Sequence, residues 1–183
     1  MPAQVFLIRH GQSTFNEAFE ATGIDPLHFD APLTALGHRQ VAAARAHAQG
    51  LEPDLVVVSP LTRAVETGLG LFHPEKAPII VSPLHRERLG NSCDVGRPPH
   101  ELSLQFPVLA FDHLDACWWH DGEKDHRGVA VEPDDVFIAR VAAFTRWLSA
   151  RPEPRIAVVG HGTFLHRMTG RHFANCEIVA WEH

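Results

Sequence analysis

The sequence predicts an α/β protein, a three-layer α/β/α sandwich with a mostly parallel central sheet and an irregular cap insertion. Short apolar runs typical of strands alternate with longer segments that carry apolar residues at helical spacing. That pattern indicates a parallel sheet covered by helices on both faces. The 183 residues are enough for one domain with a sizeable core. We therefore expect a single domain over residues 1–183, with the cap inserted at about residues 82–130.

Five runs have the composition of strands. The clearest two extend from Val5 to Ile8 and over residues 155–159, and each is a buried apolar stretch that stops at a histidine next to a glycine. The predicted strands cover residues 4–8, 54–58, 79–81 and 155–159, with a weaker one at 177–181.

Three helices follow from apolar spacing and from end signals in the sequence. The first covers residues 33–49 and has Thr34 as its cap. The second begins at Ser59-Pro60, because proline is well tolerated at the first helical position. The third covers about residues 133–150 and presents one apolar stripe toward the sheet. That stripe consists of Val136, Phe137, Val141, Phe144 and Leu148.

Residues 82–130 differ from the rest of the chain. They are rich in proline, histidine, aspartate and glycine and show weak periodicity. A long irregular insertion of this kind is usually functional or disordered. Its apolar content favours an ordered cap over the sheet edge. Trp118 and Trp119 either line a substrate pocket or pack the cap onto the sheet, and we expect core packing for at least one of them.

Composition and charge narrow the class of protein. The net charge of −6 provides no basic field for a nucleic-acid partner. The three cysteines have no CxxC spacing, which indicates a reducing compartment and no structural zinc. No segment reaches the roughly 18 apolar residues of a membrane span, and Met1-Pro2 leads into a strand without a basic leader. We expect a cytoplasmic protein with no membrane partner.

A histidine directly follows the first strand. Arg9 and His10 stand at its carboxyl end, and Gly11 lets the backbone turn there. Ligands of open α/β sheets bind at this edge. The arrangement therefore indicates a histidine placed for chemistry on an anion. For these three residues taken alone, a surface turn with a solvated arginine is the alternative.

The second and fourth strands bring further candidates to the same edge. Arg63 lies in the first turn of a helix, where side chains lean toward the N-terminus, so it should reach back over the edge. The alternative is an ion pair with Glu66 or Glu52. His161 ends the fourth strand between two glycines, and Thr163 is placed to cap a helix whose free N–H groups favour an anion. Alone, His161 would be a structural histidine, but two such histidines with two arginines favour a site.

Four motifs in this order resemble those of the histidine phosphatase superfamily, also called the phosphoglycerate mutase-like family. They are Arg-His-Gly-Gln-Ser-Thr-Phe-Asn at 9–16, Ser-Pro-Leu-Thr-Arg-Ala at 59–64, Arg-Glu-Arg-Leu-Gly at 86–90 and Gly-His-Gly at 160–162. The resemblance spans nearly the whole chain. The stretch that begins at Arg86 is also similar to that of phosphatase-like members from plants and fungi.

The resemblance implies a role for each matching residue. His10 would be the nucleophile that takes the phosphoryl group, with its second ring nitrogen fixed by a backbone carbonyl. Arg9, Arg63 and His161 would surround the transferring group and stabilise its charge. Further contacts to the phosphate are expected from Asn16 and the Gly162 N–H, with Gln12 and Ser13 as weaker candidates.

Glu87 matches the proton donor of the family. It would protonate the leaving oxygen and then activate the water that hydrolyses the phosphoenzyme. An ion pair with Arg86 or Arg88 is the alternative, and Asp94 or Glu101 remains open for the acid role.

The fourteen histidines raise the question of a metal site. There is no HExxH motif, and His161 and His166 are five residues apart, which does not place both on one helix face. A second group of histidines and aspartates falls in the insertion, and we interpret it as a coincidental polar cluster. Its members are Asp112, His113, His120, Asp121, Asp125 and His126.

Together these observations predict a metal-independent phosphatase without a cofactor that acts on a small phosphorylated metabolite. A phosphoglycerate mutase is the alternative within enzymes, but mutases of the family are generally longer. The insertion also offers only four further arginines: Arg86, Arg88, Arg97 and Arg127. An inert family member that binds a phosphorylated ligand is the alternative from another class. The sequence leaves open the substrate and the oligomeric state.

Overall fold

The computed structural model describes residues 3–181. Met1 and Pro2, on which the expectation of a missing leader partly rests, lie outside the described residues. A five-stranded sheet in the order β3-β2-β4-β1-β5 forms the centre of the molecule. Its strands are β1 (Gln4–Arg9), β2 (Leu55–Val58), β3 (Ile79–Val81), β4 (Arg155–Gly160) and β5 (Ile178–Trp181).

The sheet is mostly parallel, as predicted. β2 pairs in parallel with β3 and β4, and β4 pairs in parallel with β1, whereas the edge strand β5 runs antiparallel to β1. The register places Arg9 opposite Gly160 at the carboxyl ends of β1 and β4. His10 and His161, the next residues of each strand, therefore leave the sheet side by side.

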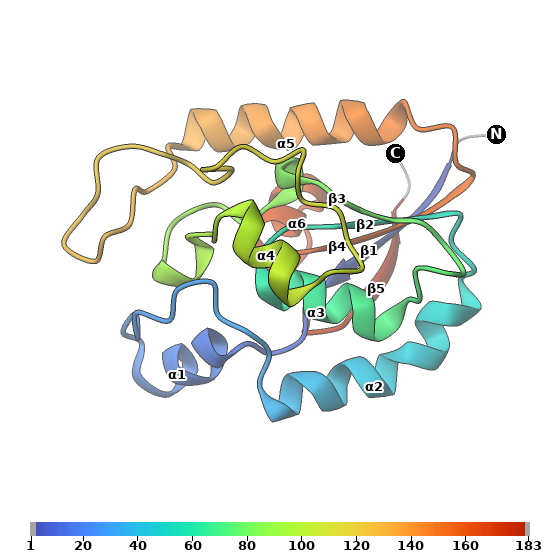
Figure 1. Ribbon diagram of the computed structural model, residues 1–183, viewed down its shortest axis with the longest axis horizontal. Coiled ribbons are helices and arrows are strands. Elements are labelled where there is room, and N and C mark those ends of the chain that lie inside the picture. The colour runs from blue at the N-terminus through green and yellow to red at the C-terminus, as the bar shows by residue number, and fades with distance from the viewer. Residues whose placement is uncertain (1–2, 182–183) are drawn as a thin grey trace.

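The described part of the chain contains six helices: α1 (Thr14–Thr22), α2 (Ala35–Gly50), α3 (Thr62–Leu71), α4 (Pro99–Gln105), α5 (Asp134–Ser149) and α6 (Gly162–Thr169). Figure 1 shows α5 along one side of the sheet, with α2 and α3 along the other.

Two separate apolar cores confirm the three-layer arrangement. Val56 and Val58 of β2 belong to the core under α2 and α3, and the intervening Val57 belongs to the core under α5 and α6. Successive side chains of a strand point to opposite faces, so a strand buried on both faces is apolar at every position. The continuous apolar runs of the sequence have this cause.

The helix boundaries confirm part of the prediction and correct part of it. Thr34 caps α2 as expected, and its side chain accepts a hydrogen bond from the Gly37 N–H. The second helix begins at Thr62 rather than at Ser59-Pro60, which form the turn before it. On α5 the inward stripe includes Arg140, while Val136 is exposed, because it lies off the helix face that packs Phe137, Val141 and Phe144 against the sheet.

The insertion is ordered and lies over the molecule as expected of a cap. It contains two short 3₁₀ helices, Pro83–His85 and Ser92–Asp94, and also α4. Trp118 is buried in the core under α2 and α3, and its indole Nε1–H donates to the Arg97 carbonyl. Gly96 allows this packing, because a Cβ there would lie 2.2 Å from the Trp118 ring. The expected core packing of one tryptophan is therefore confirmed.

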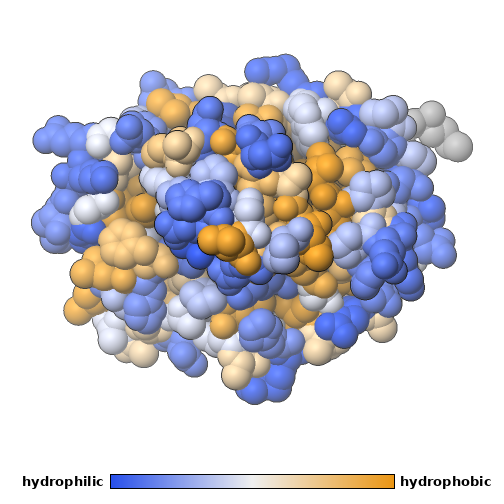
Figure 2. All heavy atoms as spheres, in the orientation of Figure 1, coloured by the Kyte–Doolittle hydropathy of each residue, from blue (hydrophilic) through white to orange (hydrophobic). Residues whose placement is uncertain are grey.

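The outer surface of the cap mixes polar with apolar side chains, as Figure 2 shows. Within residues 3–181, no helix combines the length and the apolar content needed to cross a lipid bilayer.

Candidate active site

A pocket of about 420 Å³ opens at the carboxyl edge of the sheet. Its walls come from α1, from the start of α6 and from the second 3₁₀ helix of the insertion, Ser92–Asp94. Of the residues predicted from the sequence, six line this pocket and three do not. The six are Arg9, His10, Asn16, Arg63, Glu87 and Gly162. The three are Gln12, Ser13 and His161.

His10 forms part of the pocket wall with a defined tautomer. Its Nδ1 lies 2.7 Å from the Gly11 carbonyl oxygen, which can only accept, so Nδ1 carries the proton. Nε2 is left without a proton and accepts from Nε of Arg63 at 3.2 Å. Burial lowers the pKa of His10 well below its usual value, and the charges of Arg63 and Arg9 lower it further. The imidazole is therefore neutral.

Arg63 reaches back from the first turn of α3, as predicted, and all three of its guanidinium nitrogens are in use. Besides Nε to His10, Nη1 donates to the Cys93 carbonyl at 2.6 Å and Nη2 donates to Asp94 Oδ1 at 2.9 Å. The ion pair with Asp94 is nearly inaccessible to solvent. Pairs with Glu66 or Glu52, the alternative from the sequence, are not formed by Arg63. Its orientation is thus fixed by the insertion.

His161 lies behind His10 rather than on the pocket wall. The two ring centroids are 5.2 Å apart, and the rings are inclined by 56°. Nε2 of His161 hydrogen-bonds the Ser59 hydroxyl at 2.7 Å, while its buried Nδ1 has no partner within the described residues. Burial lowers the pKa of this ring well below its usual value. A phosphate contact by His161 stays a prediction, and Nδ1 is the atom available for it.

Arg9 flanks the pocket from the end of β1. Its Nη1 donates to the Phe173 carbonyl at 2.7 Å, and its buried Nε has no partner within residues 3–181. Gly162 makes room for this side chain, because a Cβ there would lie 3.3 Å from the Arg9 Nε. Gly162 is also the first residue of α6, where backbone N–H groups have no partner inside the helix.

The capping box of α1 orients Asn16. Ser13 caps the helix, and its N–H and hydroxyl both donate to Asn16 Oδ1. This holds the amide so that Nδ2 remains to donate to a ligand. Ser13 is buried at the N-terminus of α1, and the side-chain oxygen of Gln12 accepts a hydrogen bond from the Thr34 hydroxyl. Both weaker candidates of the sequence are thus engaged in local structure instead of lining the pocket.

Glu87 occupies the N-terminus of α6. Its Oε2 accepts from the Thr163 N–H, and its Oε1 accepts from the N–H groups of Phe164 and Arg88, all at 2.9 Å. The prediction that Thr163 caps this helix is therefore wrong, because Glu87 caps it from 76 residues away. The sequence also predicted free N–H groups for a bound anion there. A side-chain carboxylate fills that position instead.

The environment of Glu87 favours its protonated form. Burial raises the pKa of the carboxyl, and the nearby carboxylate of Asp94 raises it further, while the N–H donors from Thr163 and Arg88 oppose the shift. Asp94 itself is committed to Arg63. Glu101 is exposed on α4 and does not line the pocket. Glu87 therefore has a place on the pocket wall, no ion pair within the described residues and a raised pKa, as the acid role requires.

Sequence reasoning missed the buried ion pair that supports Glu87. Arg140 of α5 pairs with Glu132, which is 0% exposed, through two hydrogen bonds. The same guanidinium donates to the carbonyls of Leu84, Arg86 and Glu87. The signal in the sequence was an arginine at an inward position of an amphipathic helix, three residues after Phe137.

A second support was also missed. Asp25, in the loop after α1, accepts from the N–H and hydroxyl of Ser92 and from Nη1 of Arg127. Arg127 also donates to the Gly90 carbonyl. These contacts fix the 3₁₀ segment that presents the Cys93 carbonyl and Asp94 to Arg63. No local pattern in the sequence marks them.

The histidines of the insertion do not converge. Nε2 of His113 donates to the Val81 carbonyl at 2.8 Å. Over residues 3–181, no three side chains among histidine, cysteine, aspartate and glutamate come together as a metal site would require.

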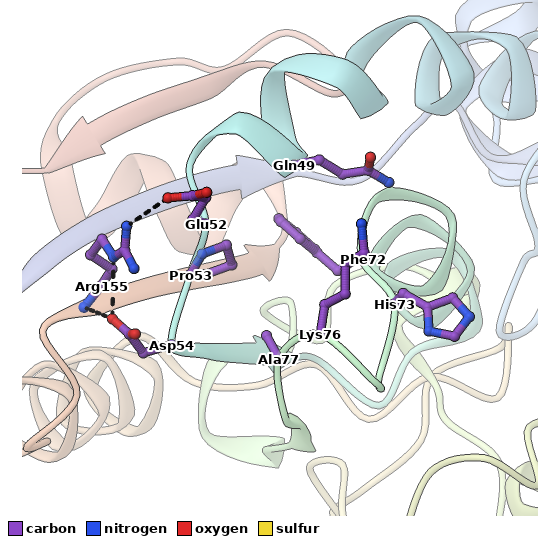
Figure 3. A pocket seen from close by; sticks show the side chains of 9 residues that line it. All are labelled: Gln49, Glu52, Pro53, Asp54, Phe72, His73, Lys76, Ala77 and Arg155. Atoms are coloured by element: carbon purple, nitrogen blue, oxygen red, sulfur yellow. Dashed lines mark hydrogen bonds and ion pairs between the residues drawn. The ribbon is translucent and has the colours of Figure 1, made fainter.

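A larger pocket, of about 530 Å³, lies at the opposite edge of the sheet, where β2 and β4 begin. Figure 3 shows Arg155 in this pocket bonded to Glu52 and Asp54. His73 and Lys76 lie on its other side. It contains none of the residues that the sequence motifs single out, so the candidate active site is the smaller pocket.

The fold and the site define an α/β sandwich whose sheet edge carries two histidines flanked by two arginines. The chain belongs to the histidine phosphatase superfamily (branch 1), whose family model matches residues 5–183. The family resemblance inferred from the four motifs is thereby confirmed.

Curated relatives carry both names of the family. Phosphoglycerate mutase-like protein 1 of Arabidopsis thaliana is 28% identical and aligns with 95% of this chain and 78% of its own length. Glucosyl-3-phosphoglycerate phosphatase of Mycolicibacterium vanbaalenii is 26% identical, with 91% of this chain and 72% of its own length covered.

Solved structures show the same fold. The alpha-ribazole phosphatase from Shigella flexneri superposes with a TM-score of 0.66 at 23% identity, covering 97% of this chain and 89% of its own. The mycobacterial glucosyl-3-phosphoglycerate phosphatase in complex with VO3 gives a TM-score of 0.59 at 20% identity, covering 96% of this chain and 90% of its own.

Proposed function

We propose that this protein hydrolyses small phosphate monoesters through a phosphohistidine on Nε2 of His10. The hydrogen bonding of that ring carries the proposal. The Gly11 carbonyl holds the proton on Nδ1, so an unprotonated Nε2 remains at the pocket. A neutral imidazole nitrogen is a nucleophile that needs no base to activate it.

In the first step, Nε2 of His10 attacks phosphorus and the bond from phosphorus to the ester oxygen breaks. Glu87 gives its proton to that oxygen, so the alcohol leaves uncharged. Arg9 and Arg63 stabilise the charge on the equatorial oxygens, which is the main source of catalysis in phosphoryl transfer. Asn16 Nδ2 and the Gly162 N–H would donate to the phosphate from the pocket wall, and Nδ1 of His161 would donate from behind His10.

In the second step, the Glu87 carboxylate takes a proton from a water molecule. The hydroxide attacks phosphorus, the nitrogen–phosphorus bond breaks, and inorganic phosphate leaves. His10 regains its lone pair and Glu87 its proton, so the cycle closes. The two guanidinium groups supply positive charge where other phosphatases use metal ions, and we include independence from metals in the proposal.

Trapping of the intermediate tests this function. Incubation with ³²P-labelled phenyl phosphate, followed by acid and alkaline quenching, should give an acid-labile and alkali-stable label that is absent from His10→Ala. Release of phosphate should continue in excess chelator. A protein that binds the ester but forms no phosphoenzyme would be the inert family member and would overturn the proposal.

The alternative of a phosphoglycerate mutase is tested with 3-phosphoglycerate. Release of inorganic phosphate supports the phosphatase. Formation of 2-phosphoglycerate without free phosphate contradicts it. The pocket favours hydrolysis, because it holds two arginines and no lysine with which to retain a bisphosphorylated intermediate.

A further inference from the structure

The four arginines of the insertion are all paired within the protein. Arg86 pairs with Glu132, Arg88 with Asp134, and Arg97 with Asp30. Arg127 pairs with Asp25 and Asp125. None of these four arginines lines the pocket. Beyond Arg9 and Arg63, which face the expected phosphate position, the pocket therefore offers no guanidinium or ammonium group to a second anionic group of a substrate.

The outer wall of the pocket is aromatic. Phe15 and Phe19 stand four residues apart on one face of α1, and their rings stack with centroids 5.4 Å apart and planes inclined by 14°. Phe173 lines the pocket as well, and its carbonyl is held by Arg9. Phe15 and Phe173 are each 5% exposed, whereas Phe19 at the mouth is 39% exposed. The site thus leaves a phenyl ring partly uncovered beside the phosphate-binding groups.

Two further rings, those of His166 and His172, lie near the same mouth. They stack on each other with centroids 4.1 Å apart and planes inclined by 5°. Such a pair adds flat ring surface to the wall, and the polar side chains of Asn91 and Thr163, which also line the pocket, carry no charge. Aromatic faces favour apolar groups over charged ones, since burial of apolar surface is stabilising and desolvation of an unpaired charge is costly.

We propose that the outer half of this pocket is a subsite for an uncharged apolar leaving group, so that the preferred substrates are phosphate monoesters of alkyl or aryl alcohols. This inference rests on the proposed phosphatase function and narrows its substrate class. A sugar phosphate or a phosphoglycerate would place hydroxyl or carboxylate groups against Phe15, Phe19 and Phe173. A hydrocarbon chain or ring would instead remove its own surface, and that of Phe19, from water.

A series of n-alkyl phosphates from ethyl to octyl tests the subsite. Their leaving alcohols have nearly equal acidity, so changes in kcat/KM report binding of the chain instead of leaving-group reactivity. Full burial of a methylene corresponds to about fourfold in affinity. Because Phe19 is partly exposed, we expect about twofold in kcat/KM for each added methylene until the chain leaves the pocket. Butyl phosphate should exceed both glycerol 3-phosphate and 3-phosphoglycerate by about tenfold or more.

Variants locate the effect. Phe19→Ala should flatten the chain-length series, with octyl phosphate losing about tenfold more kcat/KM than ethyl phosphate. Phe29→Ala is the matched control, since Phe29 is an exposed ring in the loop after α1 that does not line the pocket, and it should leave the series unchanged. If kcat/KM of the unmodified protein does not change with chain length, the subsite is overturned while the phosphatase function stands. A preference for 3-phosphoglycerate has the same consequence.

Binding of n-alkyl phosphonates, measured by calorimetry, separates the two proposals. Phosphonates are not hydrolysed, so the dependence of Kd on chain length is read without turnover. A Kd that falls about twofold per methylene and responds to Phe19→Ala supports the subsite even where no phosphohistidine forms. A Kd that is independent of chain length overturns it.

Discussion

The Nε–H of Arg63 donates a hydrogen bond to Nε2 of His10 across 3.2 Å. The nitrogen expected to attack phosphorus and the group expected to stabilise the transferring phosphoryl are therefore already adjacent in the free protein. Cys93 and Asp94 hold the other two guanidinium nitrogens. Arg63 consequently keeps its orientation when a phosphate takes the place of its contact with His10, and little reorganisation is needed during the reaction.

We expect Arg63→Lys to lower kcat for phenyl phosphate by about 10² to 10³. A lysine ammonium is a single point charge, so it cannot bond His10, the Cys93 carbonyl and Asp94 at once. Steady-state kinetics measure the effect, and circular dichroism confirms that the variant is folded. A loss of less than tenfold would show that the positive charge matters and the fork geometry does not.

We expect Glu87→Gln to slow hydrolysis of ethyl phosphate by about 10² to 10⁴, because an amide cannot protonate a poor leaving group. With 2,4-dinitrophenyl phosphate, whose leaving group needs no proton, the first step should be nearly normal. Water attack should still be slow, so labelled phosphohistidine should accumulate on His10. Equal losses for the two esters without accumulation would assign Glu87 a purely structural role.

Such a structural contribution is measurable in the same variant. One oxygen of Glu87 accepts from the Thr163 N–H at the start of α6, and the amide nitrogen of a glutamine cannot accept this bond. Loss of a helix cap typically costs about 1 kcal/mol of unfolding free energy. A modest fall in Tm is therefore expected alongside the kinetic change and does not by itself explain it.

The pH profile of kcat/KM should be bell-shaped, with His10 setting the acid limb and Glu87 the alkaline limb. His10 must be unprotonated, and burial lowers its pKa well below 6.5, so the acid limb lies far below that value. Glu87 must be protonated, and burial raises its pKa above 4.5, so the alkaline limb lies above that value. Glu87→Gln should abolish the alkaline limb. An unchanged alkaline limb in that variant would contradict the assignment of Glu87 as the acid.

The positions of His10, His161 and Arg63 were predictable because each follows a strand or opens a helix at one sheet edge. The periodicity of the strands and the direction of helical side chains are local properties of the sequence. The capping of α6 by Glu87 was not predictable, since it joins segments 76 residues apart. The local cue, Thr163 near a helix start, pointed to the wrong residue.

The supporting pair of Arg140 and Glu132 illustrates the same limit. An arginine at an inward helix position conflicts with binary patterning, and the carboxylate that resolves the conflict comes from an irregular segment eight residues earlier. The irregular cap, including α4, also lacks periodicity from which its packing could be derived. Tertiary contacts, rather than local propensity, determine these parts of the site.

We expect Arg140→Met to lower the unfolding free energy by about 3 kcal/mol, because it leaves the buried Glu132 carboxylate with only Arg86 as a partner. Denaturant unfolding measures this loss. The double variant Arg140→Met/Glu132→Leu should recover part of the stability, since it removes the unpaired charge. It should not recover kcat, because the Glu87 carbonyl still lacks its donor. Full recovery of activity would show that the pair does not position Glu87.

The buried ring of His85 should make the fold less stable in acid. His85 is fully buried, its Nε2 donates to the Val159 carbonyl, and its ring stacks on Phe144 at 4.7 Å. Burial lowers the pKa of His85 from 6.5 to about 3. The unfolded chain therefore binds a proton that the folded protein excludes, and stability falls as the pH decreases from 6.5 toward 3. At pH 4.5 this one group should lower the unfolding free energy by about 3 kcal/mol relative to pH 7.

His85→Leu should be less stable at pH 7, because it loses the hydrogen bond, but its unfolding free energy should depend less steeply on pH. Parallel curves for the two proteins, measured by urea unfolding between pH 7 and 4.5, would show that His85 takes up no proton on unfolding in this range.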